Sequence, residues 1–345
     1  MTLPTPPRQK VAVIGGAGYV GSALVPTLLE RGYEVKVIDL FLYGDQGLEA
    51  AKKSPLFKSV KADIRDRHRL LKELEGIEAV IHLACISNDP SFELNPKLGK
   101  AINYDAFPGL LEAVRENGVR RFIYASTSSV YGVKKEPHVT EETSCEPLTD
   151  YSRYKMLCED TLRSTDLGDC DTAILRPATA CGYAPRMRLD LTVNILTIHA
   201  LVRKEITVYG GNQLRPNIHV EDMVGAYRTL LEAPAEKIKG ETFNVGYENE
   251  TVMNLAEMVK RQIGDPAVAI RVEPTDDHRS YHINSDKIKR ALGFKPRYTI
   301  LDAIDSICKA YREGRIPNPL TDDRYYNIRT MKKTKLSEDP LLIER

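Results

Sequence analysis

Four glycines occur where an apolar run passes into a segment of helical period near the start of the chain. The run 10–14 is followed by Gly15-Gly16-Ala17-Gly18-Tyr19-Val20-Gly21, and residues 19–31 have the apolar spacing of a helix. Glycine adopts backbone conformations that other residues avoid, and it lets two chain segments approach closely. The sequence therefore predicts a strand, a tight turn and a helix that begins near Tyr19.

The same alternation of short and long segments continues through the first half of the chain. Strands are predicted at residues 10–14, 34–39, 57–62, 79–84, 121–126 and 171–175, and helices at 19–31, 68–74, 98–117 and 151–164. Strands that are apolar on both faces are typical of a parallel sheet covered by helices on both sides. We therefore predict an α/β fold, a doubly wound parallel Rossmann sheet with a smaller α+β lobe.

The pattern changes after Arg176-Pro177, where glycine, proline and polar residues separate short strands. We assign residues 8–176 and about 216–249 to the Rossmann domain, and about 177–215 and 250–325 to the smaller lobe. A helix near 221–232 and a strand at 242–245 are predicted to return to the larger domain. Residues 326–345 are expected to form a loosely attached tail.

The composition argues against several other classes of protein. The 345 residues carry a formal net charge of +1, so nothing in the overall charge favours a nucleic acid or an anionic membrane as partner. No apolar stretch approaches the ~20 residues that span a bilayer, and residues 1–10 do not resemble a signal peptide. The six cysteines include no Cys-x-x-Cys pair, so no metal site is predicted. We expect a cytoplasmic protein.

An acid ends the second predicted strand, at Asp39. Glycines before a helix let a pyrophosphate approach the free N–H groups of that helix, and a carboxylate at the end of the next strand accepts hydrogen bonds from ribose hydroxyls. No arginine follows Asp39 directly, so the pattern favours NAD over NADP. The structural alternative is an aspartate that only caps a turn.

A Tyr-x-x-x-Lys pair occupies positions 151 and 155. On a helix these positions share one face, so the Lys155 ammonium is expected near the Tyr151 phenol, where it lowers the pKa of the phenol. A tyrosine tuned in this way removes the proton of a sugar hydroxyl while a hydride leaves the same carbon. Upstream, strand 121–125 runs into the hydroxyl-rich segment 126–129, at the sheet edge where ligands bind. The alternatives are an ordinary helix surface and an ordinary Ser/Thr turn.

Together these motifs resemble the NAD-dependent epimerase/dehydratase family, which acts on nucleotide-sugars and belongs to the extended short-chain dehydrogenase/reductases. The resemblance extends from about residue 10 to about 320 and includes Asp63-Ile64-Arg65 and His82-Leu83-Ala84. It implies that Tyr151 is the general base, that Lys155 binds the nicotinamide ribose and that Thr127 binds the reacting sugar oxygen. The residues that it implies for cofactor binding are Gly15, Gly18, Tyr19, Val20, Gly21, Asp39, Asp63, Ile64, Leu83, Ala84, Asn103, Ser126, Tyr151 and Lys155.

The resemblance also implies a site for a nucleotide-diphosphate sugar. Arg215 matches the family's arginine for the substrate diphosphate, and a guanidinium grips phosphate oxygens through two hydrogen bonds. Segments 183–190 and 277–281 each offer further arginines for a phosphate or an acidic sugar, or simply surface charge. The implied substrate-binding residues are Thr127, Ser128, Thr179, Arg188, Asn194, Arg215 and Arg279. The family further implies a homodimer, formed by the helix after Asn103 and the helix that carries Tyr151.

Two departures from the family pattern bear on the reaction. Family dehydratases carry Asp-Glu after the threonine and decarboxylases an acid at the second of these positions, where this chain has Ser128-Ser129. This loss of both carboxylates favours a nucleotide-sugar epimerase that works through a transient keto-sugar with tightly bound NAD. The second departure is Thr179, where sugar 4-epimerases often carry asparagine. The alternatives are a nucleotide-sugar dehydratase, a keto-sugar reductase and an NAD-sensing binding protein, which has no need of the Tyr-Lys pair.

Overall fold

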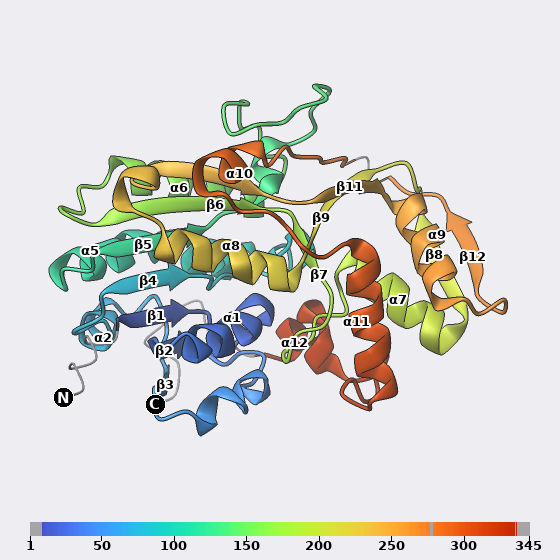
Figure 1. Ribbon diagram of the computed structural model, residues 1–345, viewed down its shortest axis with the longest axis horizontal. Helices are drawn as coiled ribbons and strands as arrows, with labels where there is room; N and C mark the ends of the chain where they lie inside the picture. Colours follow the sequence, from blue (N-terminus) through green and yellow to red (C-terminus); the bar gives the residue numbers. More distant parts are fainter. Residues whose placement is uncertain (1–8, 277–278, 335, 337–345) are drawn as a thin grey trace, which may run out of the picture.

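A seven-stranded sheet forms the centre of the molecule (Figure 1). The computed structural model describes residues 9–276, 279–334 and 336. The strand order is β10-β6-β5-β4-β1-β2-β3, and every neighbouring pair is parallel. The order reverses between β1 and β4, which makes this the switch point where ligands bind in doubly wound sheets. The predicted Rossmann fold is confirmed.

Most elements of this domain begin and end close to the predicted positions, whereas the short helix α3 at Asp89–Phe92 was not predicted. Its strands are β1 Lys10–Ile14, β2 Glu34–Asp39, β3 Phe57–Lys61, β4 Ala79–His82, β5 Arg121–Ala125, β6 Asp171–Pro177 and β10 Glu241–Val245. Its helices are α1 Tyr19–Glu30, α2 Arg67–Glu73, α3 Asp89–Phe92, α4 Pro96–Lys100, α5 Phe107–Glu116, α6 Asp150–Ser164 and α8 Val220–Glu232. Both faces of the sheet are buried, by a core that includes side chains of α1 and α8 and by a second core that includes α2, α5 and α6.

The region predicted as one helix at 98–117 is interrupted. Helices α4 and α5 are joined by a π-helical segment, Ala101–Asp105, which carries Asn103. Pro108 lies in the first turn of α5, where the N–H that it lacks would have no helical partner. A new helix therefore starts at this point, and the region does not form one uninterrupted helix.

A smaller group of elements packs at one end of the sheet domain (Figure 1). It comprises β7 Thr179–Cys181, α7 Thr192–Arg203, β8 Glu205–Tyr209, β9 Leu214–His219, β11 Glu248–Thr251, α9 Val252–Ile263, β12 Ala269–Glu273 and α11 Ile300–Arg312. Strands β11, β9 and β7 form one small sheet, and β12 and β8 form another. A separate apolar core holds α7, α9 and α11 together. Helix α10, Asp286–Leu292, packs instead against β10 of the large sheet.

The segment predicted as a tail contains a packed helix. Residues Asn327–Lys333 form α12, and the side chains of Tyr325, Tyr326 and Met331 are buried. The lysines of this segment suggested a solvated end, but the aromatic and apolar residues between them provide a face that packs on the protein. The rest of the predicted tail, residue 335 and residues 337–345, lies outside the described residues. None of the helices in the described residues combines the length and the apolar character that a membrane span requires.

Candidate functional site

A pocket of about 530 Å³ lies between the carboxyl ends of the sheet strands and the smaller lobe. It is lined at one end by the glycine turn and the end of β2, and at the other by the loop after β5 and the start of α6. The pocket brings together most of the residues predicted from the sequence, namely Gly15, Gly18, Tyr19, Val20, Gly21, Asp39, Ile64, Leu83, Ala84, Ser126, Thr127, Ser128, Tyr151, Lys155, Thr179, Arg188, Arg215 and Arg279.

Three predicted site residues are not brought to the pocket lining. The carboxylate of Asp63 pairs with the guanidinium of Arg65 at 2.7 Å. Asn103 holds the loop after β4, because its side chain both accepts from the backbone N–H of Ile86 and donates to the carbonyl of the same residue. The fully buried Asn194 accepts from the N–H of Gly182 and donates to the carbonyl of Arg188. In this structure the side-chain amide of Asn194 therefore supports residues 182–188.

The glycine turn is shaped by two close approaches of backbone to backbone. A Cβ at Gly15 would lie 2.4 Å from the backbone nitrogen of Ala84, and one at Gly21 would lie 2.5 Å from the carbonyl oxygen of Gly16. Gly18 is the N-cap of α1 and carries no side-chain cap. The first turn of α1 therefore keeps free N–H groups that fit a pyrophosphate.

Asp39 completes this end of the pocket. One carboxylate oxygen accepts from the backbone N–H of Ala17 at 2.9 Å, and the other from that of Phe41 at 2.7 Å. Burial raises the pKa of Asp39, and these hydrogen bonds oppose the rise. A carboxylate fixed in this way keeps acceptor capacity for ribose hydroxyls, so the residues present fit a bound dinucleotide.

We expect Gly15→Ala to weaken NAD binding at least tenfold and to destabilise the fold. The φ of +83° alone costs about 1–2 kcal/mol for a residue with a Cβ, and the overlap with Ala84 adds to that cost. Urea unfolding and NAD titration measure the two effects. Gly32→Ala is the matched control, because Gly32 has φ +85° but open space around its Cβ position. An equal loss of stability in both variants, with NAD binding unchanged, would contradict the proposed close approach.

Tyr151 lies in the first turn of α6, which begins with a capping box between Thr149 and Ser152. Burial raises the pKa of the Tyr151 phenol well above its ordinary value, and the charges of Cys85 and Asp89 act in the same direction. Arg188 lowers the pKa. Tyr151 and Asp89 both line the pocket.

The ammonium of Lys155 contacts two residues at the end of β5. It donates to the carbonyl oxygen of Ala125 at 2.7 Å and lies 5.1 Å from the centre of the Tyr124 ring. Lys155 is buried, and it lines the same pocket as Tyr151. The charge of Arg188 lowers the pKa of Tyr151, whereas the sequence suggested Arg188 only as a substrate contact.

The loop after β5 presents hydroxyl groups to the pocket. Thr127, Ser128 and Ser129 all line it. The Thr127 hydroxyl lies 3.0 Å from the Ser129 hydroxyl, and it accepts from the backbone N–H of Ser129. These contacts fix the start of the short 3₁₀ helix Ser128–Tyr131.

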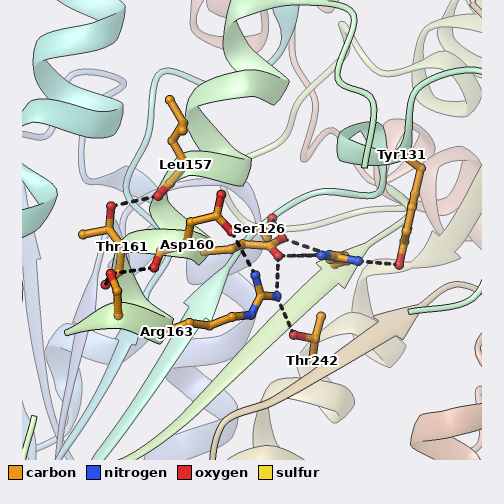
Figure 2. A network of polar contacts seen from close by, with 10 residues as sticks. Ser126, Tyr131, Leu157, Asp160, Thr161, Arg163 and Thr242 are labelled. Atoms are coloured by element: carbon orange, nitrogen blue, oxygen red, sulfur yellow. Dashed lines mark hydrogen bonds and ion pairs between the residues drawn. The ribbon is translucent and has the colours of Figure 1, made fainter. Parts of the chain in front are cut away.

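A buried ionic network contacts this loop at Ser126 and at Tyr131 (Figure 2). Glu159 of α6 is fully buried and accepts hydrogen bonds from the Arg176 guanidinium of β6, with the shortest at 2.6 Å. The same carboxylate accepts from the Ser126 hydroxyl and from Arg163. Arg176 also donates to the hydroxyl of Tyr131 at 2.8 Å. The network therefore joins α6, β6 and both ends of the hydroxyl-bearing loop.

Sequence reasoning missed Glu159 and Arg176. Burial on its own would raise the pKa of Glu159, but the hydrogen bonds and charge of Arg176 lower it, so the carboxylate is ionised. Two signals were present in the sequence: an arginine inside the apolar strand 171–177, and a glutamate one helical turn after Lys155 on the same face.

The arginines of the second half converge on the pocket. Arg188 pairs with Asp190 at 3.0 Å. Arg215 donates to the carbonyl oxygen of Arg279, whose own guanidinium pairs with Asp89 at 2.6 Å. Of the predicted segment 277–281, residues 277–278 lie outside the described residues. Among the residues described, no cluster of three or more His, Cys, Asp or Glu side chains suits a metal ion.

The fold and this pocket define a dinucleotide-binding protein of the short-chain dehydrogenase/reductase type. The model of the NAD dependent epimerase/dehydratase family matches residues 11–246. The chain is 28% identical to UDP-glucose 4-epimerase of Lactobacillus helveticus, over 88% of this chain and 96% of that protein. It is 31% identical to UDP-glucuronic acid decarboxylase 1 of Arabidopsis thaliana, over 90% of this chain and 71% of that protein.

A solved structure shows the same relationship. UDP-glucose-4-epimerase from Stenotrophomonas maltophila, with bound NAD and formylated UDP-arabinopyranose, superposes with a TM-score of 0.79 at 25% identity. The match covers 89% of this chain and 98% of that one. The chain belongs to the NAD-dependent epimerase/dehydratase family, and its cofactor is NAD.

Proposed function

We propose that this protein is a nucleotide-sugar epimerase, which oxidises one sugar carbon to a transient ketone and reduces it again on the opposite face. The observation that carries this proposal is the hydroxyl-lined loop beside Tyr151, where Ser128 and Ser129 stand in place of the acids used in dehydration. Asp89 also lines the pocket, but it accepts a hydrogen bond from Thr149 and pairs with Arg279. A carboxylate held in this way is a poor base for removing a proton beside the ketone.

In the proposed mechanism, Tyr151 takes the proton of the reacting hydroxyl and returns it after the sugar has turned. NAD bound at the glycine turn supplies the hydride acceptor and donor and, when oxidised, a positive charge that favours the Tyr151 phenolate. Arg188 already acts on Tyr151 in that direction. Thr127 binds the reacting oxygen, and Lys155 binds the ribose next to the nicotinamide. Burial of the site keeps water away from the transient ketone.

We propose a uridine diphosphate sugar as the first substrate to test, because the relatives named above act on or bind UDP-sugars. Arg215 lines the pocket, and we assign it to the substrate diphosphate. We expect Arg215→Gln to raise the dissociation constant of UDP roughly tenfold to a hundredfold, because a charge-assisted contact is lost. Calorimetric titration measures this constant. NAD binding should stay unchanged, and a variant that instead loses NAD would contradict the assignment of Arg215 to the substrate.

The reaction itself is tested by incubating the purified protein with a panel of UDP-sugars and following the products by NMR. An epimer formed without net production of NADH supports the proposal. A product that has lost water would identify a dehydratase, and steady consumption of free NADH would identify a reductase. Binding of NAD with no turnover of any sugar would favour an NAD-sensing protein.

We also propose that the protein is a homodimer that associates through helices α5 and α6. Sedimentation velocity at micromolar concentration tests this directly, with a species of twice the chain mass as the expected result.

A further inference from the structure

Arg186 lies beside the glycine turn although it belongs to the second half of the chain. Its backbone N–H donates to the Ser22 hydroxyl on α1 at 3.0 Å. Its guanidinium lies 4.3 Å from the centre of the Tyr43 ring, and its charge acts on Asp39. Arg186 also lines the pocket. The guanidinium is thus next to the part of the site that fits a pyrophosphate and the adenosine ribose.

Three hydrogen-bond donors here are buried and have no partner among the residues that the structure describes. They are the Nε of Arg186, the hydroxyl of Tyr43 and one terminal nitrogen, Nη2, of Arg188. The two arginines are 6% and 8% exposed, and all three residues line the pocket. A buried donor without a partner is unfavourable, and a charged one more so. The three donors together therefore point to an anionic ligand.

The electrostatics of Arg186 agree with this geometry. Burial, followed by the charge of Arg188, lowers the pKa of Arg186 to about 10. Its nearby acids, Asp39 and Asp190, oppose that shift without cancelling it. On balance, the surroundings therefore disfavour the positive charge of Arg186. A bound anion would favour that charge instead.

Helix α12 fixes the position of this guanidinium. The side-chain oxygen of Asn327, the first residue of α12, accepts from Arg186 at 2.7 Å. The backbone N–H of Asn327 donates to Asp190, and its side-chain amide donates to Ser87. Asn327 is 1% exposed and also lines the pocket. Asn327 therefore joins the C-terminal part of the chain to the pocket wall.

We infer that Arg186, held by Asn327, binds the diphosphate of NAD together with the first turn of α1. A diphosphate is also present in a nucleotide-sugar, but Arg186 lies by Asp39 and the glycine turn, whereas Arg215 lies in the other part of the pocket wall. The inference rests on the cofactor and not on the epimerase reaction. A cofactor held from two sides suits an enzyme that oxidises and reduces in one cycle without releasing NAD.

The test is calorimetric titration of protein freed of nucleotide, with NAD, ADP-ribose and UDP as separate ligands. Arg186→Gln should weaken the binding of NAD and of ADP-ribose by the same factor, roughly tenfold to a hundredfold. It should change the affinity for UDP less than twofold. Arg186→Lys should recover part of the affinity, since it keeps the charge but not the planar donor pair. Asn327→Leu should weaken the binding of NAD by a smaller factor, because Arg186 is still present but has lost the hydrogen bond that positions it.

Arg324→Gln is the control, because Arg324 belongs to the same C-terminal region but is exposed and pairs with Asp322. It should leave all three affinities unchanged. If Arg186→Gln weakens UDP and leaves NAD unchanged, the anion site belongs to the substrate and the inference is overturned. If it lowers only the unfolding temperature of the ligand-free protein, Arg186 is structural, and the inference fails equally. Neither result depends on whether the wild-type protein epimerises a sugar.

Discussion

Replacing Tyr151 by phenylalanine should lower kcat on the nucleotide-sugar by roughly 10²- to 10⁴-fold, while NAD binding stays as in the wild type. The phenol is the proposed acid and base, and proton transfer by a positioned side chain contributes a factor of this size. Phenylalanine keeps the ring, so packing in the pocket is retained. Initial rates at saturating substrate and a parallel NAD titration provide the two measurements.

Tyr154→Phe is the matched control on the same helix. The Tyr154 ring packs on Phe92 and Tyr104, and Tyr154 does not belong to the proposed proton path. Its loss of hydroxyl should leave kcat within about threefold of the wild type, well short of a catalytic effect. Full turnover by Tyr151→Phe would remove the proposed base, and an equal loss in both variants would indicate a general effect on α6.

Removal of Glu159 should produce the largest loss of stability. Glu159→Ala leaves the Arg176 guanidinium buried without its carboxylate, and breaking a buried ion pair from one side costs about 3–5 kcal/mol. The two side chains are 0% and 5% exposed, so solvent cannot replace the lost partner. Urea unfolding at neutral pH, followed by circular dichroism, measures the change in the free energy of unfolding.

Arg163 supplies the control for this prediction. It pairs with the same carboxylate but is 40% exposed, so Arg163→Ala should cost only about 0–1 kcal/mol. The double variant Glu159→Leu with Arg176→Met should recover much of the lost stability, because it removes both buried charges. A cost for Glu159→Ala no greater than that for Arg163→Ala would show that the network contributes little.

The pH dependence of this pair has a defined sign. The pKa of Glu159 is lowered in the folded protein, so the ion pair contributes stability that is fully present above the ordinary carboxyl pKa of 4.5. This contribution is lost as the pH falls through the lowered pKa of the folded state. Comparison of wild type and Glu159→Gln in the acid range should therefore show their stabilities converging as the pH falls.

The sequence predicted those parts of the candidate site whose positions are set by short, continuous segments of the chain. The first strand, the glycine turn and Asp39 belong to one continuous strand–turn–helix–strand unit, so spacing along the chain was enough to place them. The pair formed by Tyr151 and Lys155 could also be predicted from the sequence, since a helix puts positions four apart on one face. The hydroxyl-bearing loop followed from its place at the end of a buried strand.

Other features depend on partners that the local sequence does not reveal. The sequence did not reveal that the amide of Asn194 holds residues 182–188. The orientation of Lys155 toward Ala125 depends on where β5 ends relative to α6. Asn327 lay in a segment that looked solvated because lysines follow it. Its contacts are with residues far away in the chain. Tertiary packing decided each of these cases.

Helix α6 carries Tyr151, Lys155 and Glu159 at intervals of four residues, each about 6 Å further along the axis. The proposed base, the buried ammonium and the carboxylate that contacts the loop therefore move as one rigid body. A slide or rotation of this helix would displace all three by a common amount. The spacing of these three groups relative to one another is thus fixed by the helix, and the ion pair between Glu159 and Arg176 of β6 opposes movement of the helix as a whole.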